Sequence, residues 1–348
     1  MKQSNLLQTI ILLLGVLLLT VGCNTDGEGL FYLVSQSEES VNVGAVTLIG
    51  STPTDLFAHT DSSGLQRYTI SSGAWTSIPA SVTPVLANQV STDGTNIYYS
   101  GRSGEGENNK LYSFVKSGIP DYSSSVASLN NTYDILSMLP QHDLMTTREG
   151  TDIKVRKVSD GTEIASHAGT FVDALLLAQG NYSLSSGYTG TSPRTYTHTL
   201  FDGTNSTVIT LKDGTTSVTD AVIKAFFIDG TNIAVVTGGG DVYFKTGLTI
   251  TGAPTELAKN GNVPLSSSTV TLSPLPVVHE ALSSTSSTFF VQGLNNYMYE
   301  IDPADGTAVE KSFSTIALTV QVSSFLEANS KYYIGTVSNG ILEITFPL

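Results

Sequence analysis

The sequence has few charged residues, few basic residues and almost no cysteine. Of its 348 residues, 16 are lysine or arginine and 30 are aspartate or glutamate, which gives a formal net charge of −14. Nucleic-acid recognition needs a basic surface, and docking on anionic lipid needs a run of basic residues, so neither function is expected. The chain has one cysteine. It cannot form an internal disulfide or a multi-cysteine metal site.

The apolar content is nevertheless sufficient for a folded body. Hydrophobic residues make up 40% of the sequence, which argues against wholesale disorder. The chain is long for a single ordinary core. Its length fits two or three domains or a repeat architecture.

The first 23 residues have the layout of a secretory signal. Lys2 provides a positive start, residues 10–19 form an apolar run, and Thr20 begins a short segment that leads to Cys23. The uncharged run 6–23 is also about the minimum length of a membrane span, so an uncleaved anchor is the alternative.

The position of the cysteine favours processing. The segment resembles the signal of bacterial lipoproteins, whose lipobox ends in a small residue followed by the cysteine that becomes the acylated first residue. Gly22 and Cys23 match this pattern, whereas Thr20 stands where leucine is usual. The resemblance implies lipidation of Cys23 and anchoring to a membrane of the cell envelope. In this resemblance, Asn24 directly after the cysteine favours the outer membrane over the inner membrane.

Three segments follow from this interpretation. Residues 1–22 are the expected signal peptide, residues 23–29 are the lipidated cysteine with a short tether, and residues 30–348 form a single domain. The tether extends over about 20 Å at most, which would keep the domain close to the bilayer.

The body has the pattern of repeated β-hairpins. No stretch after residue 29 keeps a helical apolar period for three turns, and the most helix-like segment is 171–178. The triplet Asp-Gly-Thr occurs six times, starting at Asp93, Asp160, Asp202, Asp213, Asp229 and Asp305. Asp-Gly is favoured in hairpin turns because glycine adopts positive φ at little cost. We therefore interpret these aspartates as turn residues.

The turns recur at a regular distance. The first hairpin turn of each unit is expected near Thr52, Gly94, His142, Gly180, Gly230, Ser284 and Asn329. A mean spacing of about 46 residues with four short strands per unit is typical of a β-propeller. The sequence predicts an all-β propeller of seven four-stranded blades, closed by an N-terminal strand at residues 30–34. Tandem β-sandwich modules are the alternative, although their repeat is about twice as long.

The body resembles bacterial β-propeller lipoproteins in general, without the motif of a particular subfamily. It lacks Trp-Asp repeat endings and kelch glycine doublets, and Trp75 is its single tryptophan. The resemblance implies a domain that binds another protein or an envelope component.

Motifs for chemistry are scarce. The five histidines show no spacing for a local metal site, and nucleophile-elbow, nucleotide-binding and calcium-loop motifs are absent. Acidic residues do recur where innermost strands are expected to begin, at the mouth of the central channel. These candidate residues are Asp134, Asp173, Asp220 and Glu280, with Asn88 and Gln321 at the corresponding positions of other blades. Such a ring could hold Ca²⁺ or bind a basic partner, or it could be a solvated rim.

Three functions remain open from the sequence. The leading hypothesis is a lipid-anchored, non-enzymatic scaffold in the cell envelope. The second is an envelope hydrolase or lactonase whose substrate is polarised by a cation at the acidic mouth. The third is a surface-exposed adhesin. No cofactor other than Ca²⁺ is expected.

Overall fold

The computed structural model describes residues 44–344, apart from the internal stretches 81–84, 102–109, 119–124, 127–133, 169–170, 172, 191–192, 265–278, 284–285, 294–297, 312–321, 330 and 339. The expected signal, Cys23, the tether and the expected strand at 30–34 lie outside the described residues. Within the described part of the chain, no helix has the length and apolar character needed to cross a membrane.

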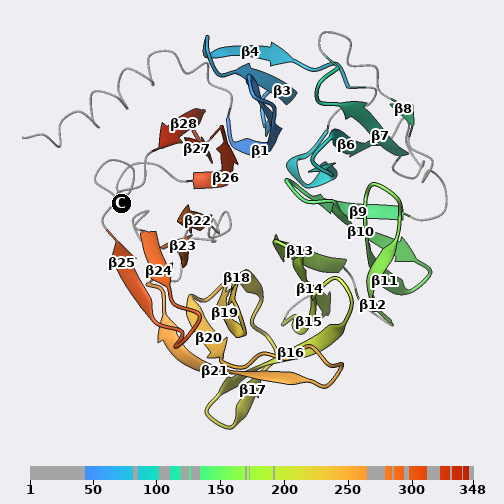
Figure 1. Cartoon of the computed structure of the whole chain (residues 1–348). Helices are drawn as coiled ribbons and strands as arrows, with labels where there is room; N and C mark the ends of the chain where they lie inside the picture. The colour runs from blue at the N-terminus through green and yellow to red at the C-terminus, as the bar shows by residue number, and fades with distance from the viewer. Residues whose placement is uncertain are drawn as a thin grey trace, which may run out of the picture.

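Short antiparallel sheets follow one another around a ring (Figure 1), and we call each one a blade. Blade 1 comprises β1 (Val46–Ser51), β2 (Asp55–Thr60), β3 (Gly64–Thr69) and β4 (Ala74–Ser77). The single-turn helix η1 (Ala87–Gln89) precedes blade 2, which comprises β5 (Val90–Thr92), β6 (Asn96–Gly101), β7 (Lys110–Val115) and β8 (Ser125–Val126). Blade 3 comprises β9 (Asp134–Leu139), β10 (Leu144–Glu149), β11 (Asp152–Arg156) and β12 (Glu163–His167).

The ring continues through four further blades. Blade 4 comprises β13 (Asp173–Gln179), β14 (Tyr182–Thr189), β15 (Thr195–Phe201) and β16 (Ser206–Asp213), with β17 (Thr216–Val218) paired to β16. Blade 5 comprises β18 (Ile223–Asp229), β19 (Asn232–Thr237), β20 (Asp241–Lys245) and β21 (Thr255–Asn262). Blade 6 comprises β22 (His279–Ser283), β23 (Ser286–Gln292), β24 (Met298–Ile301) and β25 (Ala308–Lys311). Blade 7 comprises β26 (Val322–Ala328), β27 (Lys331–Thr336) and β28 (Ile341–Ile344).

The first strand of each blade lies innermost, and later strands follow outwards (Figure 1). This arrangement is a seven-bladed β-propeller, so the predicted fold class and blade number are confirmed. Six of the seven predicted first turns fall between the first and second strands of their blades, and the seventh, near Ser284, lies outside the described residues, between β22 and β23. The helix-like segment 171–178 is largely strand β13. Strand β13 pairs with β14 along its whole length.

The Asp-Gly-Thr triplets lie at turns between paired strands, as interpreted from the sequence. The glycine of each triplet has positive φ, for example 94° at Gly203. The side chain of Asp202 adds to this turn, because its Oδ1 accepts hydrogen bonds from the amides of Thr204 and Asn205 at 2.9 and 2.6 Å. Turn geometry therefore accounts for the recurrence of the triplet.

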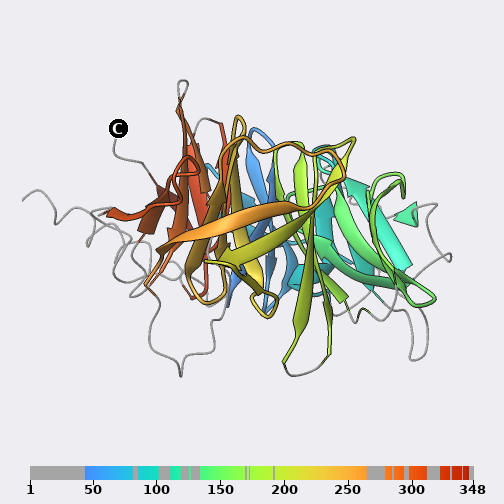
Figure 2. The ribbon, with the colours of Figure 1, turned by 90° about the horizontal axis from the view of Figure 1, so that it is seen from below.

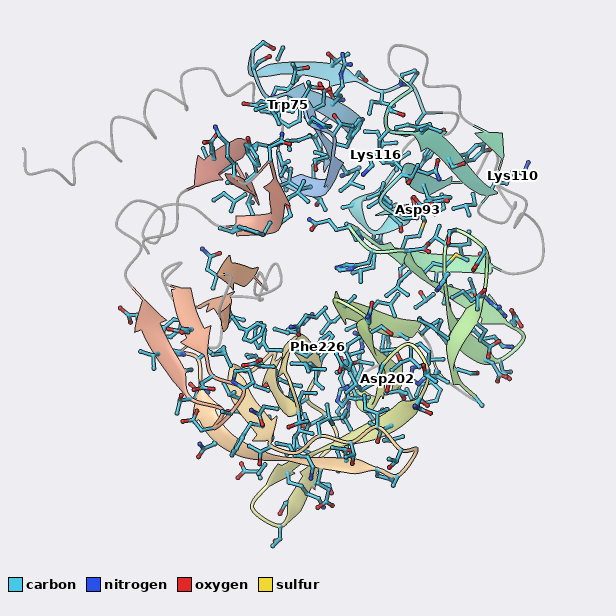
Figure 3. The ribbon with its side chains drawn as sticks, viewed as in Figure 1. Trp75, Asp93, Lys110, Lys116, Asp202 and Phe226 are labelled. Carbon is cyan, nitrogen blue, oxygen red and sulfur yellow. The ribbon has the colours of Figure 1, made fainter. Side chains whose placement is uncertain are left out.

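Adjacent side chains of an inner strand serve opposite junctions, because strand side chains alternate between the two faces of a sheet. Phe226 of β18 packs in the core between blades 4 and 5 (Figure 3), whereas Phe227 packs between blades 5 and 6. The Phe227 ring lies 5.0 Å from that of Phe289 in blade 6. Since both faces of the blade are covered, β18 reads as an almost continuous apolar run.

A polar side chain also crosses each of the seven junctions. At the junction of blades 4 and 5, Gln179 donates to the carbonyl of Ile228 and accepts from its amide, at 3.1 and 2.8 Å. The other junctions are crossed by hydrogen bonds between His59 and Val85, Ser91 and His142, His167 and Ser185, Asn260 and Asp305, Gln292 and Val322, and Ser324 and Leu48. Each bond contributes about 0.5–1.5 kcal/mol. Each also fixes how one blade is aligned against the next.

Blades 4 and 5 are joined more tightly than the rest. Their outer strands β16 and β21 pair in parallel, with Ile209 opposite Thr255 and Lys212 opposite Ala258. The two blades therefore form one nine-stranded sheet. The hairpin formed by β16 and β17 projects beyond the rim of the ring (Figure 2).

The ring closes between blade 7 and blade 1 through very close backbone packing. Ser324 of β26 accepts a hydrogen bond from the Leu48 amide at 2.8 Å and donates one to the Val46 carbonyl at 3.0 Å. Gly335 of β27 lies against the same carbonyl, and a Cβ atom at this position would overlap both Val46 O and Ser324 Oγ. Only glycine fits this contact.

We expect Gly335→Ala to destabilise the whole ring, because the added methyl group must push blade 7 away from blade 1. The expected loss is about 1–3 kcal/mol, the usual cost of overpacking. The free energy of unfolding from urea denaturation measures it. Gly239→Ala is the control, since a Cβ there meets only Thr237 Oγ1 at 3.8 Å. Equal stability of the two variants would contradict the closure described here.

Candidate functional site

The acidic residues singled out from the sequence do lie at the beginnings of innermost strands. Asp134 and Asp173 are the first residues of β9 and β13, and Glu280 is the second residue of β22. Asp220 comes three residues before β18, and Asn88 lies in η1 directly before β5. The side chains of Asp173 and Glu280, and residue Gln321, lie outside the described part of the structure.

The described members of this set have different surroundings. Asp134 is partly buried and stands opposite Arg148 in the β9–β10 ladder. Within the described residues, its Oδ1 atom is buried without a hydrogen-bond partner. Asp220 is exposed, and no pair of described strands brings it next to Asp134. Among the described residues there is no group of three or more histidine, cysteine or acidic side chains that could hold a metal ion. The predicted cation site remains a prediction, because two of its four carboxylates are not described.

A buried serine–histidine pair lies in blade 4, and no sequence motif predicted it. Ser186 Oγ is 2.8 Å from His198 Nδ1, and His198 Nε2 is 3.2 Å from the Ala221 carbonyl. A carbonyl can only accept, so Nε2 carries the proton and Nδ1 accepts from the serine hydroxyl. This is the geometry of a nucleophile with its base. However, Ser186 and His198 are only 1% and 2% exposed, which excludes substrate. The pair therefore links blade 4 to the segment before blade 5.

Burial keeps these histidines neutral. The pKa of His198 is lowered to about 4, mainly by burial; the hydrogen bond to Ala221 opposes this shift, and the neighbouring His167 adds to it. Burial also lowers the pKa of His167, whose Nε2 lies 2.8 Å from Ser185 Oγ. Both rings are thus structural, as expected for histidines without a metal-binding spacing.

A second polar network lies near Asp93 and Lys116 of blade 2 (Figure 3). It is at the end of the blade opposite to the start of its innermost strand, β5. Asp93 accepts hydrogen bonds from the amides of Thr95 and Asn96 and from the Tyr98 hydroxyl. Burial and the Asp93 carboxylate raise the pKa of Tyr98. Lys116 is 8% exposed; burial lowers the pKa of its amine and the charge of Asp93 raises it. The network has a cation and an anion of its own, so we assign it to the fold.

The sequence did not reveal the residues that cross between blades. The Ser324–Leu48 bond joins positions 276 residues apart, and the Gln179–Ile228 pair joins positions 49 apart. Serine and glutamine are common and carry no spacing signal, so only the three-dimensional arrangement identifies them.

Acidification should destabilise the protein through His198. Its pKa is about 6.5 when unfolded and about 4 when folded, so the unfolded state binds the proton first. The contribution of His198 to the free energy of unfolding is therefore fully present above pH 6.5 and is lost as the pH falls towards 4. In His198→Gln, the slope of unfolding free energy against pH in this window should decrease by about 1.4 kcal/mol per pH unit. Ser186→Ala keeps the imidazole and should keep the slope. Parallel curves for His198→Gln and the parent would contradict this prediction.

The cation site predicts a calcium effect on stability. If the carboxylates hold Ca²⁺, calcium should raise the melting temperature above that in a chelator, because a ligand that binds only the folded state stabilises it. The double variant Asp173→Asn, Asp220→Asn should lose this difference. Asp61→Asn, on an exposed turn of blade 1, is the control for loss of a surface carboxylate outside the proposed site. Identical melting of the parent in calcium and in chelator would exclude the site.

Comparison with known proteins yields structural likeness only. No protein-family model matches the sequence, and no curated protein matches it. Among solved structures, the chain is similar to U3-55K (11% identity, 87% of this chain and 96% of that chain covered, TM-score 0.49) and to YCF48 from Cyanidioschyzon merolae (10% identity, 87% and 96% covered, TM-score 0.49). It is also similar to the computationally designed Ika8 protein (10% identity, 86% and 96% covered, TM-score 0.47). The ring of sheets itself defines the fold.

Proposed function

We propose that this protein is a lipid-anchored scaffold of the cell envelope, whose propeller binds another protein or an envelope component. The observation that carries the proposal is the Gly22-Cys23 pair, which closes the short segment that follows the apolar run 10–19. A cysteine at this position is the acylation site of a bacterial lipoprotein signal. Two or more acyl chains anchor a protein stably, whereas a single chain does so only reversibly.

The propeller itself favours binding over chemistry. The faces of the blades are buried against neighbouring blades, so loops and strand ends are the parts of the ring that a partner can contact. The serine–histidine pair of blade 4 is buried away from substrate. The low proportion of charged residues, 13%, suits contact with a neutral or weakly basic partner.

The short tether restricts where a partner can be. Residues 24–29 reach about 20 Å when fully extended. A propeller held at this distance meets proteins and lipids of the same membrane more often than soluble ones. An outer-membrane location, on either its periplasmic or its external face, is the form of the proposal that Asn24 favours.

The proposal predicts that Cys23→Ser releases the protein from membranes. Metabolic labelling with a palmitate analogue and fractionation of membranes measure the result, and Thr25→Ser is the control that leaves the signal unchanged. The parent and Thr25→Ser should be labelled and membrane-bound, whereas Cys23→Ser should be unlabelled. Label that persists in Cys23→Ser, or a parent without label, would contradict the anchor.

Cross-linking in native membranes then tests the scaffold role. The acylated parent should capture an envelope protein in near-stoichiometric amount, and Cys23→Ser should capture far less of it because the tether no longer raises its local concentration. Protease cleavage on intact cells separates a periplasmic scaffold from an external adhesin. An acylated protein that captures no partner would overturn the scaffold role and leave the anchor standing.

A further inference from the structure

Blade 7 has one strand fewer than the other blades among the described residues. Blades 1 to 6 each contain at least four strands in a row, whereas blade 7 contains β26, β27 and β28. Within the described part of the chain, β28 pairs with β27 alone. The corresponding strands β3, β7 and β20 each carry a further strand on their outer edge. The outermost position of blade 7 is therefore one that no described strand fills.

Blade 1 faces this position with aromatic side chains. Leu56, Tyr68 and Trp75 lie opposite one another on β2, β3 and β4, so they form one row across the blade. The same core contains three residues of blade 7, namely Ala328, Tyr333 and Ile341. Trp75 belongs to the outermost strand of blade 1 (Figure 3), where it meets the Tyr68 ring edge to face, with centroids 5.1 Å apart. Both rings are partly exposed.

At the junction of blades 4 and 5, by contrast, the outermost strands cover each other. Ile209 and Leu211 of β16 share a buried core with Leu257 of β21, and none of the three is more than 3% exposed. Trp75 has no such counterpart among the described residues of blade 7. An unpaired strand edge beside partly exposed aromatic rings is a surface that an extended apolar segment can cover, through backbone pairing and side-chain packing.

The chain itself contains a segment with the required composition. Residues 30–34 read Leu-Phe-Tyr-Leu-Val and lie outside the described residues. Because side chains alternate between the two faces of a strand, a strand of this composition is apolar on both faces. An outermost strand of blade 7 would have blade 1 on one face and blade 6 on the other. Both of its apolar faces would then be next to a neighbouring blade.

The length of the connecting segment agrees with this position. Eleven residues, 35–45, lie between the segment and β1. Elsewhere in the ring, the connection from the outermost strand of one blade to the innermost strand of the next has between five residues, at 168–172, and sixteen, at 263–278. Eleven extended residues reach about 36 Å, whereas three strand spacings amount to about 14 Å. The segment can therefore reach the rim of blade 7.

We propose that the outer edge of β28, together with Tyr68 and Trp75, is a binding site for an extended apolar strand, and that residues 30–34 fill it in the same chain. The backbone of the bound strand pairs with β28, and one face of its side chains covers Trp75. The sequence alone predicts a closing strand, and the structure adds the surface that receives it. The same surface should bind this segment as a free peptide.

The site has a consequence for the orientation of the ring, which rests on the proposed lipid anchor. The tether 24–29 would leave the propeller at the rim of the junction between blades 7 and 1. A tether of about 20 Å would then hold this rim, and not either end of the channel, towards the membrane.

Trp75 is the single tryptophan of the chain, so its fluorescence reports on the site directly. In the full chain, Leu33→Pro should shift the emission to longer wavelength and raise the acrylamide quenching constant at least twofold, because proline cannot donate to the ladder with β28. Ser37→Pro introduces the same residue in the connection that follows and should behave like the parent. Where Leu33→Pro does not fold, Leu33→Ser gives the same readout with a smaller shift. Equal fluorescence of the parent and the Leu33 variants would overturn the proposal.

A synthetic peptide of residues 28–36 separates strand binding from a general loss of structure. Added to the folded Leu33→Pro protein, the peptide should restore the emission and quenching of the parent. The same peptide carrying Leu33→Pro should not. These readouts do not involve acylation of Cys23, so a failure of the lipid anchor leaves them valid.

A fluorescein-labelled form of the peptide tests the role of Trp75 by anisotropy. In the Leu33→Pro protein, Trp75→Ala should weaken peptide binding at least tenfold. Leu86→Ala is the control, because it removes an apolar side chain that is 50% exposed at another place in the ring, and it should leave binding unchanged. A folded Leu33→Pro protein that does not bind the peptide, or that binds it equally well without Trp75, would overturn the proposal.

Discussion

The structure depends on a contact between its two ends that no covalent bond supports. Blade 7 meets blade 1 where Gly335 lies against the Val46 carbonyl and Ser324 bonds to both Val46 and Leu48. The residues in these hydrogen bonds are 276 and 278 positions apart. The chain must bear the entropy cost of closing that long loop, and closure is rewarded only when every blade is in place. An open ring would also expose sheet faces that are buried at every other junction.

The remaining junctions repeat the same physical arrangement with different residues. Apolar side chains alternate between the two faces of a blade, so that Phe226 and Phe227 serve different cores. Apolar packing alone has little directional preference. A buried hydrogen bond such as the Gln179–Ile228 pair does have one, since an unpaired polar group at that depth costs free energy. The junction of blades 4 and 5 therefore combines adhesion from the apolar core with alignment from the polar side chain.

The architecture could be predicted from the sequence because turn chemistry is local. Asp-Gly-Thr marked the first turns of blades 2 and 5, Gly180 marked that of blade 4, and the regular spacing of the units placed the others between the first and second strands of their blades. The beginnings of innermost strands followed from the same register, which is why Asp134 and Asp173 were placed correctly. By contrast, Gln179 and Ile228 come from different blades and meet only once the two blades have packed together. Neither residue type nor spacing carries a signal for such a meeting, so the sequence could not predict it.

The parallel pairing of β16 with β21 makes the ring mechanically unequal. Four residue pairs connect the rims of blades 4 and 5, in addition to the core and the Gln179 contact between them. These two blades cannot swing apart without breaking backbone pairs. Relative motion between blades is consequently expected at the other six junctions. Blades 4 and 5 should move together as one rigid unit.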